Sequence, residues 1–357
     1  MKKRIIYLVI VSLAFIFIAG CNCNKTNIYE LALITDKGDI DDKSFNQGAW
    51  EGLVKYATDN NKTRNYYRPA EATNDAYIAS IGLAVEGGAK VVVTPGYLFE
   101  TAINVCQTKY PKVKFIILDG SPASVSGGTL ENNVYAVFYA EEQAGFLAGY
   151  AAVMDGYRNL GFMGGIAVPP VIRFGHGFIF GANKAAEELA LSNDEVKIKF
   201  HYTNTFNASP DVQSKAAGWY SAGTEVIFAC GGAIGQSIMA AAEASNKKVI
   251  GVDVNQKNDS NTVITSAMKG LGASVISALE KYYNNKWDEI GGKTVSLGAD
   301  VNGVGLPDDF SRFKNFTKEA YDVIFNQLVD KTVVVTVDIS ISPDEYTNIP
   351  KVKVYTE

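Results

Sequence analysis

The sequence of 357 residues predicts an α/β protein made of two Rossmann-like lobes, each with a parallel sheet between layers of helices. Short runs rich in valine and isoleucine alternate with longer segments of helical periodicity. These runs are almost continuously apolar, as in strands that are buried on both faces. The alternation restarts near residue 140, with no Pro/Gly/Ser-rich linker, and so divides the chain into two lobes of similar size.

The first lobe is predicted to begin near residue 29. Strands are expected over 31–35, 65–68, 90–94 and 114–118, and helices over 44–57, 76–86 and 99–108. The strand over 90–94 is the clearest, because it is an almost unbroken run of valines. Asp41 or Asp42 stands where the helix over 44–57 needs a cap for its free backbone N–H groups.

The second lobe repeats the pattern. Strands are expected over 134–139, 159–163, 197–202, 226–229 and 248–252, and helices over 143–154, 172–190, 210–221 and 235–244.

The last hundred residues add elements that complete both lobes. Strands are expected over 263–267, 294–297 and 333–337, and helices over 271–283 and 317–327. They predict a third and a fourth crossing between the lobes, with 29–139 and about 268–315 in lobe 1, and 140–267 and about 316–357 in lobe 2. Facing parallel sheets form a ligand cleft at the carboxyl ends of their strands. One long doubly wound domain is the structural alternative.

The amino terminus has the features of an export signal. Three cations at positions 2–4 precede an apolar run over 5–18, which is too short to span a membrane. Ile18-Ala19-Gly20-Cys21 resembles the lipobox of bacterial lipoproteins. We therefore expect a signal peptide over 1–20, acylation of Cys21 and a lipidated tether over 21–28. An ordinary signal peptide with an incidental cysteine is the alternative.

Composition excludes several classes of protein. The formal net charge of −5 and the absence of a basic stripe argue against nucleic-acid binding. Four scattered cysteines are too few for a disulfide framework. Cys106 and Cys230 lie in apolar segments and are expected to be buried free thiols, whereas Cys23 stays open.

Two loops between a strand and a helix carry candidate ligand contacts. The loop over 35–47 has four aspartates in seven positions and ends near Phe45. Its spacing lacks the alternating ligands and final glutamate of a calcium loop, so helix capping explains the acids better than a metal. The loop over 203–211 carries Phe206. Two aromatic side chains, one from each lobe, could hold a flat ring between them.

The predicted strand ends of lobe 2 offer polar groups. Asp253 could accept hydrogen bonds from vicinal hydroxyls, and Lys269 would offset the cost of burying that carboxylate. Gly231 and Gly232 allow close approach of the backbone. Phosphate-binding and zinc-protease motifs are absent, and His176 and His201 are the only histidines. The sequence therefore predicts no enzyme, no catalytic residue, no metal and no cofactor.

Three segments together resemble the basic membrane protein family of lipoproteins, and within it the purine nucleoside receptors: Asp41-Asp42-Lys43-Ser44-Phe45-Asn46-Gln47, Glu142-Gln143-Ala144-Gly145-Phe146-Leu147-Ala148-Gly149 and Gly251-Val252-Asp253-Val254-Asn255-Gln256. The likeness runs from about residue 30 to the end. It implies a type I periplasmic-binding-protein fold with three crossovers. It also implies that a nucleoside binds in the cleft and passes to an ATP-driven permease.

The resemblance also assigns roles to single residues. It implies that Asp36 and Asn46 contact the base or line the cleft, that Phe45 and Phe206 enclose the base, and that Asp253 holds the ribose hydroxyls. Gly232 and Lys269 would complete the ribose side, and the loop over 95–99 would line the cleft, with Tyr97 as its candidate contact.

The resemblance further implies an ABC permease of the inner membrane as partner. We expect a monomer that contacts the cell membrane only through its lipid anchor and faces the periplasm or the exterior. A sugar receptor of the same fold, a surface adhesin and a nucleoside hydrolase are the alternatives.

Overall fold

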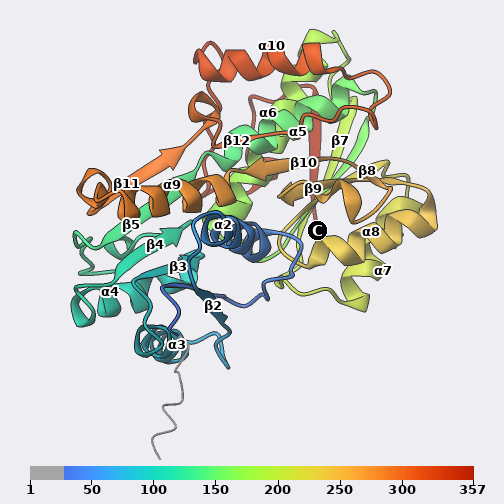
Figure 1. Cartoon of the computed structure of the whole chain (residues 1–357). Coiled ribbons are helices and arrows are strands. Elements are labelled where there is room, and N and C mark those ends of the chain that lie inside the picture. The colour runs from blue at the N-terminus through green and yellow to red at the C-terminus, as the bar shows by residue number, and fades with distance from the viewer. Residues whose placement is uncertain (1–27) are drawn as a thin grey trace, which may run out of the picture.

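The computed structural model describes residues 28–357, which form two α/β lobes (Figure 1). The predicted signal peptide, Cys21 and Cys23 lie outside the described residues. No helix within the described part of the chain is long and apolar enough to cross a membrane.

The sheet of lobe 1 has the strand order β11-β5-β4-β3-β1-β2, and all its neighbouring strands are parallel. Its strands are β1 (Leu31–Ile34), β2 (Arg64–Tyr67), β3 (Val91–Pro95), β4 (Lys114–Leu118), β5 (Val134–Tyr139) and β11 (Lys293–Leu297). Its helices are α2 (Phe45–Asp59), α3 (Asn74–Glu86), α4 (Glu100–Lys109) and α9 (Leu271–Tyr283). β11 comes from far along the chain and closes the edge beside β5 (Figure 1).

The sheet of lobe 2 has the order β12-β10-β9-β8-β6-β7-β13, in which only the β10–β12 pair is antiparallel within the described residues. Its strands are β6 (Asn159–Gly164), β7 (Val196–Tyr202), β8 (Val226–Cys230), β9 (Lys248–Asp253), β10 (Val263–Lys269), β12 (Val304–Gly305) and β13 (Val352–Thr356). Its helices are α5 (Glu141–Met154), α6 (Pro169–Glu188), α7 (Pro210–Ser221), α8 (Ile234–Ser245) and α10 (Lys318–Val329).

The chain passes between the sheets three times within residues 28–357: after β5, after β10 and after β11. The fourth crossing expected from the last hundred residues does not occur, whereas three crossovers are what the family resemblance implied. The two separate sheets also exclude a single doubly wound domain. The predicted boundary near residue 315 is wrong, because β12 already pairs with β10 in the second sheet.

The strand predicted over 333–337 is also wrong. That segment has no regular structure, although Val333 and Val335 pack against the core while Val334 is 71% exposed. The segment is amphipathic at strand spacing but has no strand beside it. β13 pairs with β7 at that sheet edge instead.

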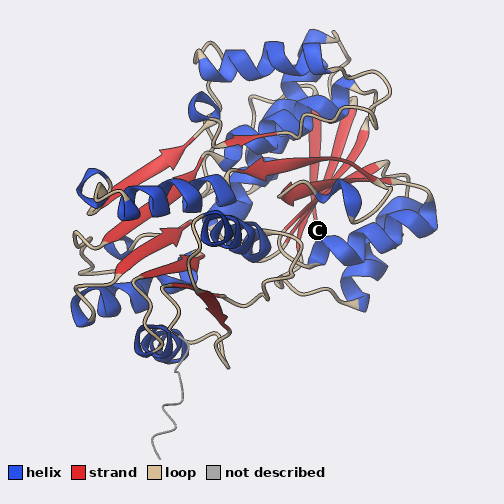
Figure 2. Cartoon of the chain, viewed as in Figure 1, coloured by secondary structure: helices blue, strands red, loops and turns tan. Residues whose placement is uncertain are grey.

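Helices cover both faces of each sheet (Figure 2). In lobe 1, α3 and α4 pack on one face and α2 and α9 on the other; in lobe 2, α7 and α8 pack on one face and α5 and α6 on the other. The α2/α9 face and the α5/α6 face belong to one continuous apolar core. The lobes are therefore joined by shared packing as well as by the crossing segments.

Helices α5 and α6 approach each other closely through glycines. A Cβ atom at Gly149 would lie 2.0 Å from the carbonyl oxygen of Phe178, and one at Gly181 would lie 1.9 Å from that of Phe146. Only glycine permits such backbone contact. The packing fixes the amino-terminal parts of both helices, which carry Glu141 and Arg173.

Candidate functional site

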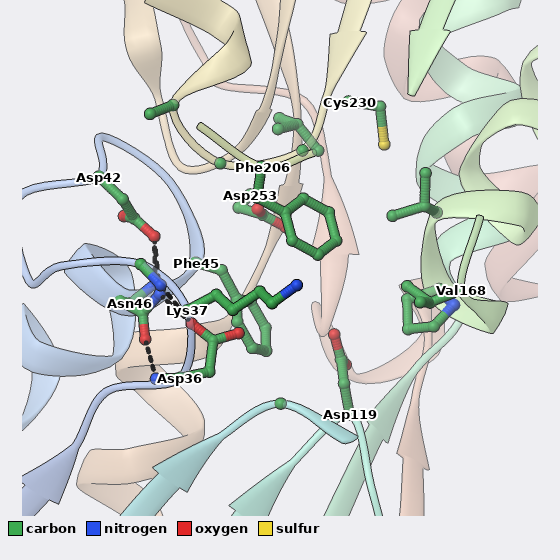
Figure 3. Close-up of a pocket in the computed structure, with 18 of the residues that line it drawn as sticks. Asp36, Lys37, Asp42, Phe45, Asn46, Asp119, Val168, Phe206, Cys230 and Asp253 are labelled. Atoms are coloured by element: carbon green, nitrogen blue, oxygen red, sulfur yellow. Dashed lines mark hydrogen bonds between the residues drawn. The ribbon is translucent and has the colours of Figure 1, made fainter. Parts of the chain in front are cut away.

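A cavity of about 350 Å³ lies between the lobes, where the carboxyl ends of their strands meet (Figure 3). This is the usual ligand position in open parallel sheets, and the volume suits a small ligand. The cavity is lined by all eight residues that the sequence predicted as ligand contacts: Asp36, Phe45, Asn46, Tyr97, Phe206, Gly232, Asp253 and Lys269. Both lobes contribute to it.

One end of the cavity is formed by the loop between β1 and α2. Asp36 Oδ1 accepts hydrogen bonds from the backbone N–H of Gly38 and from Asn46 Nδ2, both at 2.9 Å. Asn46 Nδ2 also donates to Asp42 Oδ2 at 2.9 Å, so both its amide hydrogens are used within the loop. Burial raises the pKa of Asp36, although these hydrogen bonds oppose the shift. Among residues 28–357 no hydrogen bond ends on Asp36 Oδ2, which can therefore accept one from a ligand.

Asp42 has a structural role in the same loop. Its carboxylate accepts hydrogen bonds from the backbone N–H groups of Ser44, Asn46 and Gln47 at 2.8, 3.0 and 3.1 Å. These groups lie at the start of α2, where the helix itself offers no acceptor. Asp42 is thus the capping residue, whereas Asp41 is exposed. Burial raises the pKa of Asp42, and its hydrogen bonds oppose the shift.

Two phenylalanines point into the cavity from opposite lobes (Figure 3). Phe45 is the first residue of α2, and Phe206 lies in the loop between β7 and α7. A Cβ atom at Gly165 would lie 2.4 Å from Phe206 Cδ1, so the glycine makes room for the ring. The ammonium nitrogen of Lys269 lies 4.8 Å from the centroid of the Phe45 ring, a favourable cation–π distance.

The other end of the cavity is a buried cluster of charges around Lys269. Its ammonium nitrogen lies 2.5 Å from Asp119 Oδ2 and 3.4 Å from Glu141 Oε1. Asp253 Oδ1 lies 3.8 Å away, so Asp119 rather than Asp253 is its closest partner. Arg173 Nε lies 2.6 Å from Glu141 Oε2. The cluster holds three carboxylates against two cations, which leaves one negative charge in excess when all are ionised.

Burial and the neighbouring charges together set the pKa values in this cluster. Burial, with a smaller contribution from Glu141, raises the pKa of Asp119 to about 7, although Lys269 opposes the shift. Burial also raises the pKa of Asp253, against the effect of Lys269. For Lys269 burial acts to lower the pKa, but the neighbouring carboxylates outweigh it and raise the pKa. Lys269 therefore stays charged, and the raised pKa of Asp119 brings the titration of its carboxyl group close to neutral pH.

Two aspartates of this cluster have unusual backbone conformations. Asp119 follows β4 with φ of 55°, and Asp253 ends β9 with φ of 65°. Left-handed conformations cost non-glycine residues of the order of 1–3 kcal/mol and gather at functional sites. Asp253 Oδ2 accepts the Ser44 hydroxyl at 2.5 Å. Asp119 Oδ1 is buried and has no hydrogen-bond partner among the described residues, so a ligand donor would satisfy it.

The loop over 95–99, at the end of β3, was expected to line the cleft through Tyr97. Gly96 and Tyr97 line the cavity, whereas Phe99 is fully buried against Tyr77, with ring centroids 4.4 Å apart. Gly232 also lines the cavity and has φ of 55°.

A family model described as "ABC transporter substrate-binding protein PnrA-like" matches residues 29–339. The nucleoside-binding protein BmpA of an ABC transporter of Lactococcus lactis subsp. cremoris (strain MG1363) is 28% identical over 92% of this chain and 97% of its own. Basic membrane protein B of Borreliella burgdorferi (strain ATCC 35210 / DSM 4680 / CIP 102532 / B31) is 28% identical over 86% of this chain and 87% of its own.

The chain belongs to this family of substrate-binding proteins, abbreviated Bmp. The family assignment from the three sequence segments is thereby confirmed. A solute-binding protein of an ABC transporter from Aeropyrum pernix K1 has a similar structure, with a TM-score of 0.73 and 18% identity over 87% of this chain and 94% of its own. At this identity the likeness concerns the fold, and it confirms the type I periplasmic-binding-protein architecture.

Some residues around the candidate site were not predicted from the sequence. Asp119 had a usable signal, because it follows a buried apolar strand in the same way as Asp253 does. Glu141 is the first residue of α5 and Arg173 lies near the start of α6, where charged residues are common, so nothing in the sequence distinguished them. Cys106 and Cys230 were predicted correctly as buried free thiols.

Proposed function

We propose that this Bmp protein binds a purine nucleoside, such as adenosine, guanosine or inosine, and delivers it to an ABC permease. The observation that supports this most strongly is the division of the cavity into aromatic walls and two different polar ends. A nucleoside has the same division, with a flat base and a polyhydroxylated sugar.

The base would lie between Phe45 and Phe206. Aromatic stacking contributes about 0.5–1.5 kcal/mol for each pair beyond the burial of apolar area. Asp36 Oδ2 would accept a hydrogen bond from the exocyclic amino group of adenine or from the ring N–H of hypoxanthine and guanine. Asn46 would orient Asp36, since both of its amide hydrogens are already used.

The ribose would lie at the charged end. Asp253 and Asp119 would accept hydrogen bonds from its hydroxyls, each worth about 1.5–3 kcal/mol when the acceptor is charged. Lys269 would keep the carboxylates stable while water is excluded. Gly232 would let the backbone approach the sugar. Because carboxylates outnumber cations here, a phosphate on the sugar would be repelled, and nucleotides should bind more weakly than nucleosides.

Similarity to a relative supports the same ligand class, because the Lactococcus lactis relative is named a nucleoside-binding protein. Hinge motion of the lobes around the nucleoside would present a changed surface to the permease. We expect no chemical change in the ligand, and inosine recovered intact after incubation would agree with that.

The test is a thermal-shift panel on ligand-stripped mature protein with purine nucleosides, cytidine, free bases, ribose, glucose and galactose. A ligand at 100 times its Kd adds about 2.7 kcal/mol of stability. Stabilisation by purine nucleosides alone is the expected result. Stabilisation by sugars alone would replace the nucleoside with a sugar, and no shift from any compound would overturn the proposal that the protein binds a purine nucleoside.

We also propose that acylated Cys21 holds the protein at the outer face of the cell membrane. Two or more acyl chains on one residue are sufficient for stable anchoring, whereas one chain binds only marginally. Mass spectrometry of the mature amino terminus should find a lipid-modified cysteine. An unmodified terminus would rule the anchor out.

A further inference from the structure

A second cavity of about 280 Å³ adjoins the ligand cavity at the open side of the cleft. Lobe 1 contributes the segment after β2, and lobe 2 contributes the segments after β6 and β7. The two cavities border each other, because both are lined by Asp36, Lys37, Arg68, Phe206 and Asn207.

The second cavity lies at one end of the ligand cavity only. Asp36, which would accept a hydrogen bond from the base, borders both cavities. Asp119, Asp253 and Lys269, which would hold the sugar, border only the first. A group that extends into the second cavity would therefore be attached to the base rather than to the sugar.

The lining of the second cavity is polar and nearly balanced in charge. Lys37 and Arg68 supply two cations, Asp36 and Glu71 supply two carboxylates, and Asn204 and Asn207 supply amides. The long side chain of Lys37 points into the cleft (Figure 3) and forms no ion pair among the described residues. A neutral group that both donates and accepts hydrogen bonds matches this lining, whereas an apolar group would displace water from exposed charged groups and offer them no hydrogen bond.

Both walls of the second cavity are tied to neighbouring parts of the protein. On lobe 2, the backbone N–H of Asn204 donates to Gly165 O at 3.1 Å, and that of Asn207 donates to Thr205 Oγ1 at 3.1 Å. On lobe 1, Arg68 forms a solvent-exposed ion pair with Asp39 at 2.6 Å.

We propose that the second cavity is a subsite for a neutral polar substituent on the exocyclic nitrogen of the purine. The receptor would then take N-substituted purine nucleosides as well as unsubstituted ones. A singly substituted nitrogen keeps one hydrogen for Asp36, so the contact of the base is retained while the substituent passes Phe206. The inference rests on the proposed binding of purine nucleosides.

The test compares two adenosines that carry substituents of nearly equal size on this nitrogen, 2-hydroxyethyl and propyl. Calorimetric titration of the full mature chain should give a Kd for the hydroxyethyl compound within about threefold of that of adenosine. The propyl compound should bind roughly tenfold more weakly than the hydroxyethyl compound, because it would displace water from the polar lining without replacing the hydrogen bonds of that water.

Ala70 supplies a matched variant, because it is exposed and lines only the second cavity. Ala70→Tyr should fill the subsite. It should weaken binding of the hydroxyethyl compound at least tenfold and leave the affinity for adenosine unchanged. Ala123→Tyr, at an exposed alanine that lines neither cavity, is the control and should change neither.

The outcomes separate the two proposals. The subsite is wrong, and the nucleoside site stands, if adenosine binds but the Kd of both substituted compounds is more than thirtyfold higher. The same conclusion follows if Ala70→Tyr leaves the Kd of the hydroxyethyl compound unchanged. Equal binding of the propyl and hydroxyethyl compounds would overturn the polar character of the subsite. Failure of adenosine itself to bind would overturn both proposals.

Discussion

The two lobes share one strand order, but different residues follow the corresponding strands. The order β5-β4-β3-β1-β2 in lobe 1 matches β10-β9-β8-β6-β7 in lobe 2. After β1 and β3, lobe 1 places Asp36 and Tyr97 at the cavity. After β6 and β8, lobe 2 places Gly165 and Gly231, whose missing side chains leave space for Phe206. Lobe 1 thus contributes polar contacts at the base end, and lobe 2 contributes room for an aromatic wall.

One pair of strand ends is alike in both lobes. β4 and β9 each lead into an aspartate with left-handed backbone conformation, Asp119 and Asp253, and both carboxylates lie near Lys269. At the charged end, both lobes therefore supply the same kind of residue. At the base end, each lobe supplies a different kind of group. Each prediction below alters one side of this comparison.

The largest effect is expected when the shared cation is removed. Lys269→Met would leave the carboxylates of Asp119, Asp253 and Glu141 buried without it, and breaking a buried ion pair costs about 3–5 kcal/mol. Urea unfolding should show this loss in the free energy of unfolding. Lys281→Met is the control: its ion pair with Glu289 is exposed, and such pairs contribute about 0–1 kcal/mol. Equal losses in both variants would contradict a stabilising role of the shared cluster.

The next effect concerns the lobe 2 aspartate of the pair. Asp253→Ala should weaken adenosine binding at least tenfold, because the ribose hydroxyls lose a charged acceptor. Calorimetric titration measures the ratio of Kd values. Asp288→Ala, at an exposed position, should leave it unchanged. An unaltered Kd in Asp253→Ala would show that the sugar does not lie at this end.

The lobe 1 aspartate should be visible in the pH dependence of stability. Because burial raises the pKa of Asp119 from 3.8 to about 7, the folded state keeps a proton that the unfolded chain has released. This contribution to stability is complete below pH 4 and is lost as the pH rises to about 7. Asp119→Asn should therefore flatten the profile of unfolding free energy over that range. An identical slope in wild type and variant would refute the assignment.

The smallest effect tests the room that lobe 2 leaves for its aromatic wall. Gly165→Ala places a Cβ atom 2.4 Å from the Phe206 ring, which must shift and stack less well on the base. We expect adenosine binding to weaken about fivefold, since a stacking contact is worth about 0.5–1.5 kcal/mol. Gly218→Ala has no neighbour within 4 Å of its new Cβ and should leave affinity unchanged. A similar Kd in both variants would separate Phe206 from the ligand.

Much of the fold could be predicted from the sequence, because buried parallel strands have a distinct apolar pattern. The exceptions have physical reasons. Residues 333–337 alternate between inward and outward side chains, yet a strand needs a neighbour to bond with, and sequence spacing does not reveal one. β12 was not predicted, because a strand of two residues is too short to show an alternating pattern in the sequence.

The predicted residues of the candidate site were brought together, but their partners could not be predicted. Lys269 was expected to offset the burial of the Asp253 carboxylate. Its closest carboxylate is instead that of Asp119, more than a hundred residues away in the other lobe. Distances across the cleft depend on how the lobes pack. Sequence reasoning places a residue at a strand end and does not show which opposite residue it meets.

The most direct test of the account is a calorimetric titration of ligand-stripped wild-type protein with adenosine and with 2′-deoxyadenosine. The account predicts a one-to-one complex with adenosine and at least tenfold weaker binding of the deoxy compound, because a buried carboxylate is then left without its hydroxyl. Equal affinity for the two compounds, or no binding of adenosine, would contradict the proposed division of the cavity into a base end and a ribose end.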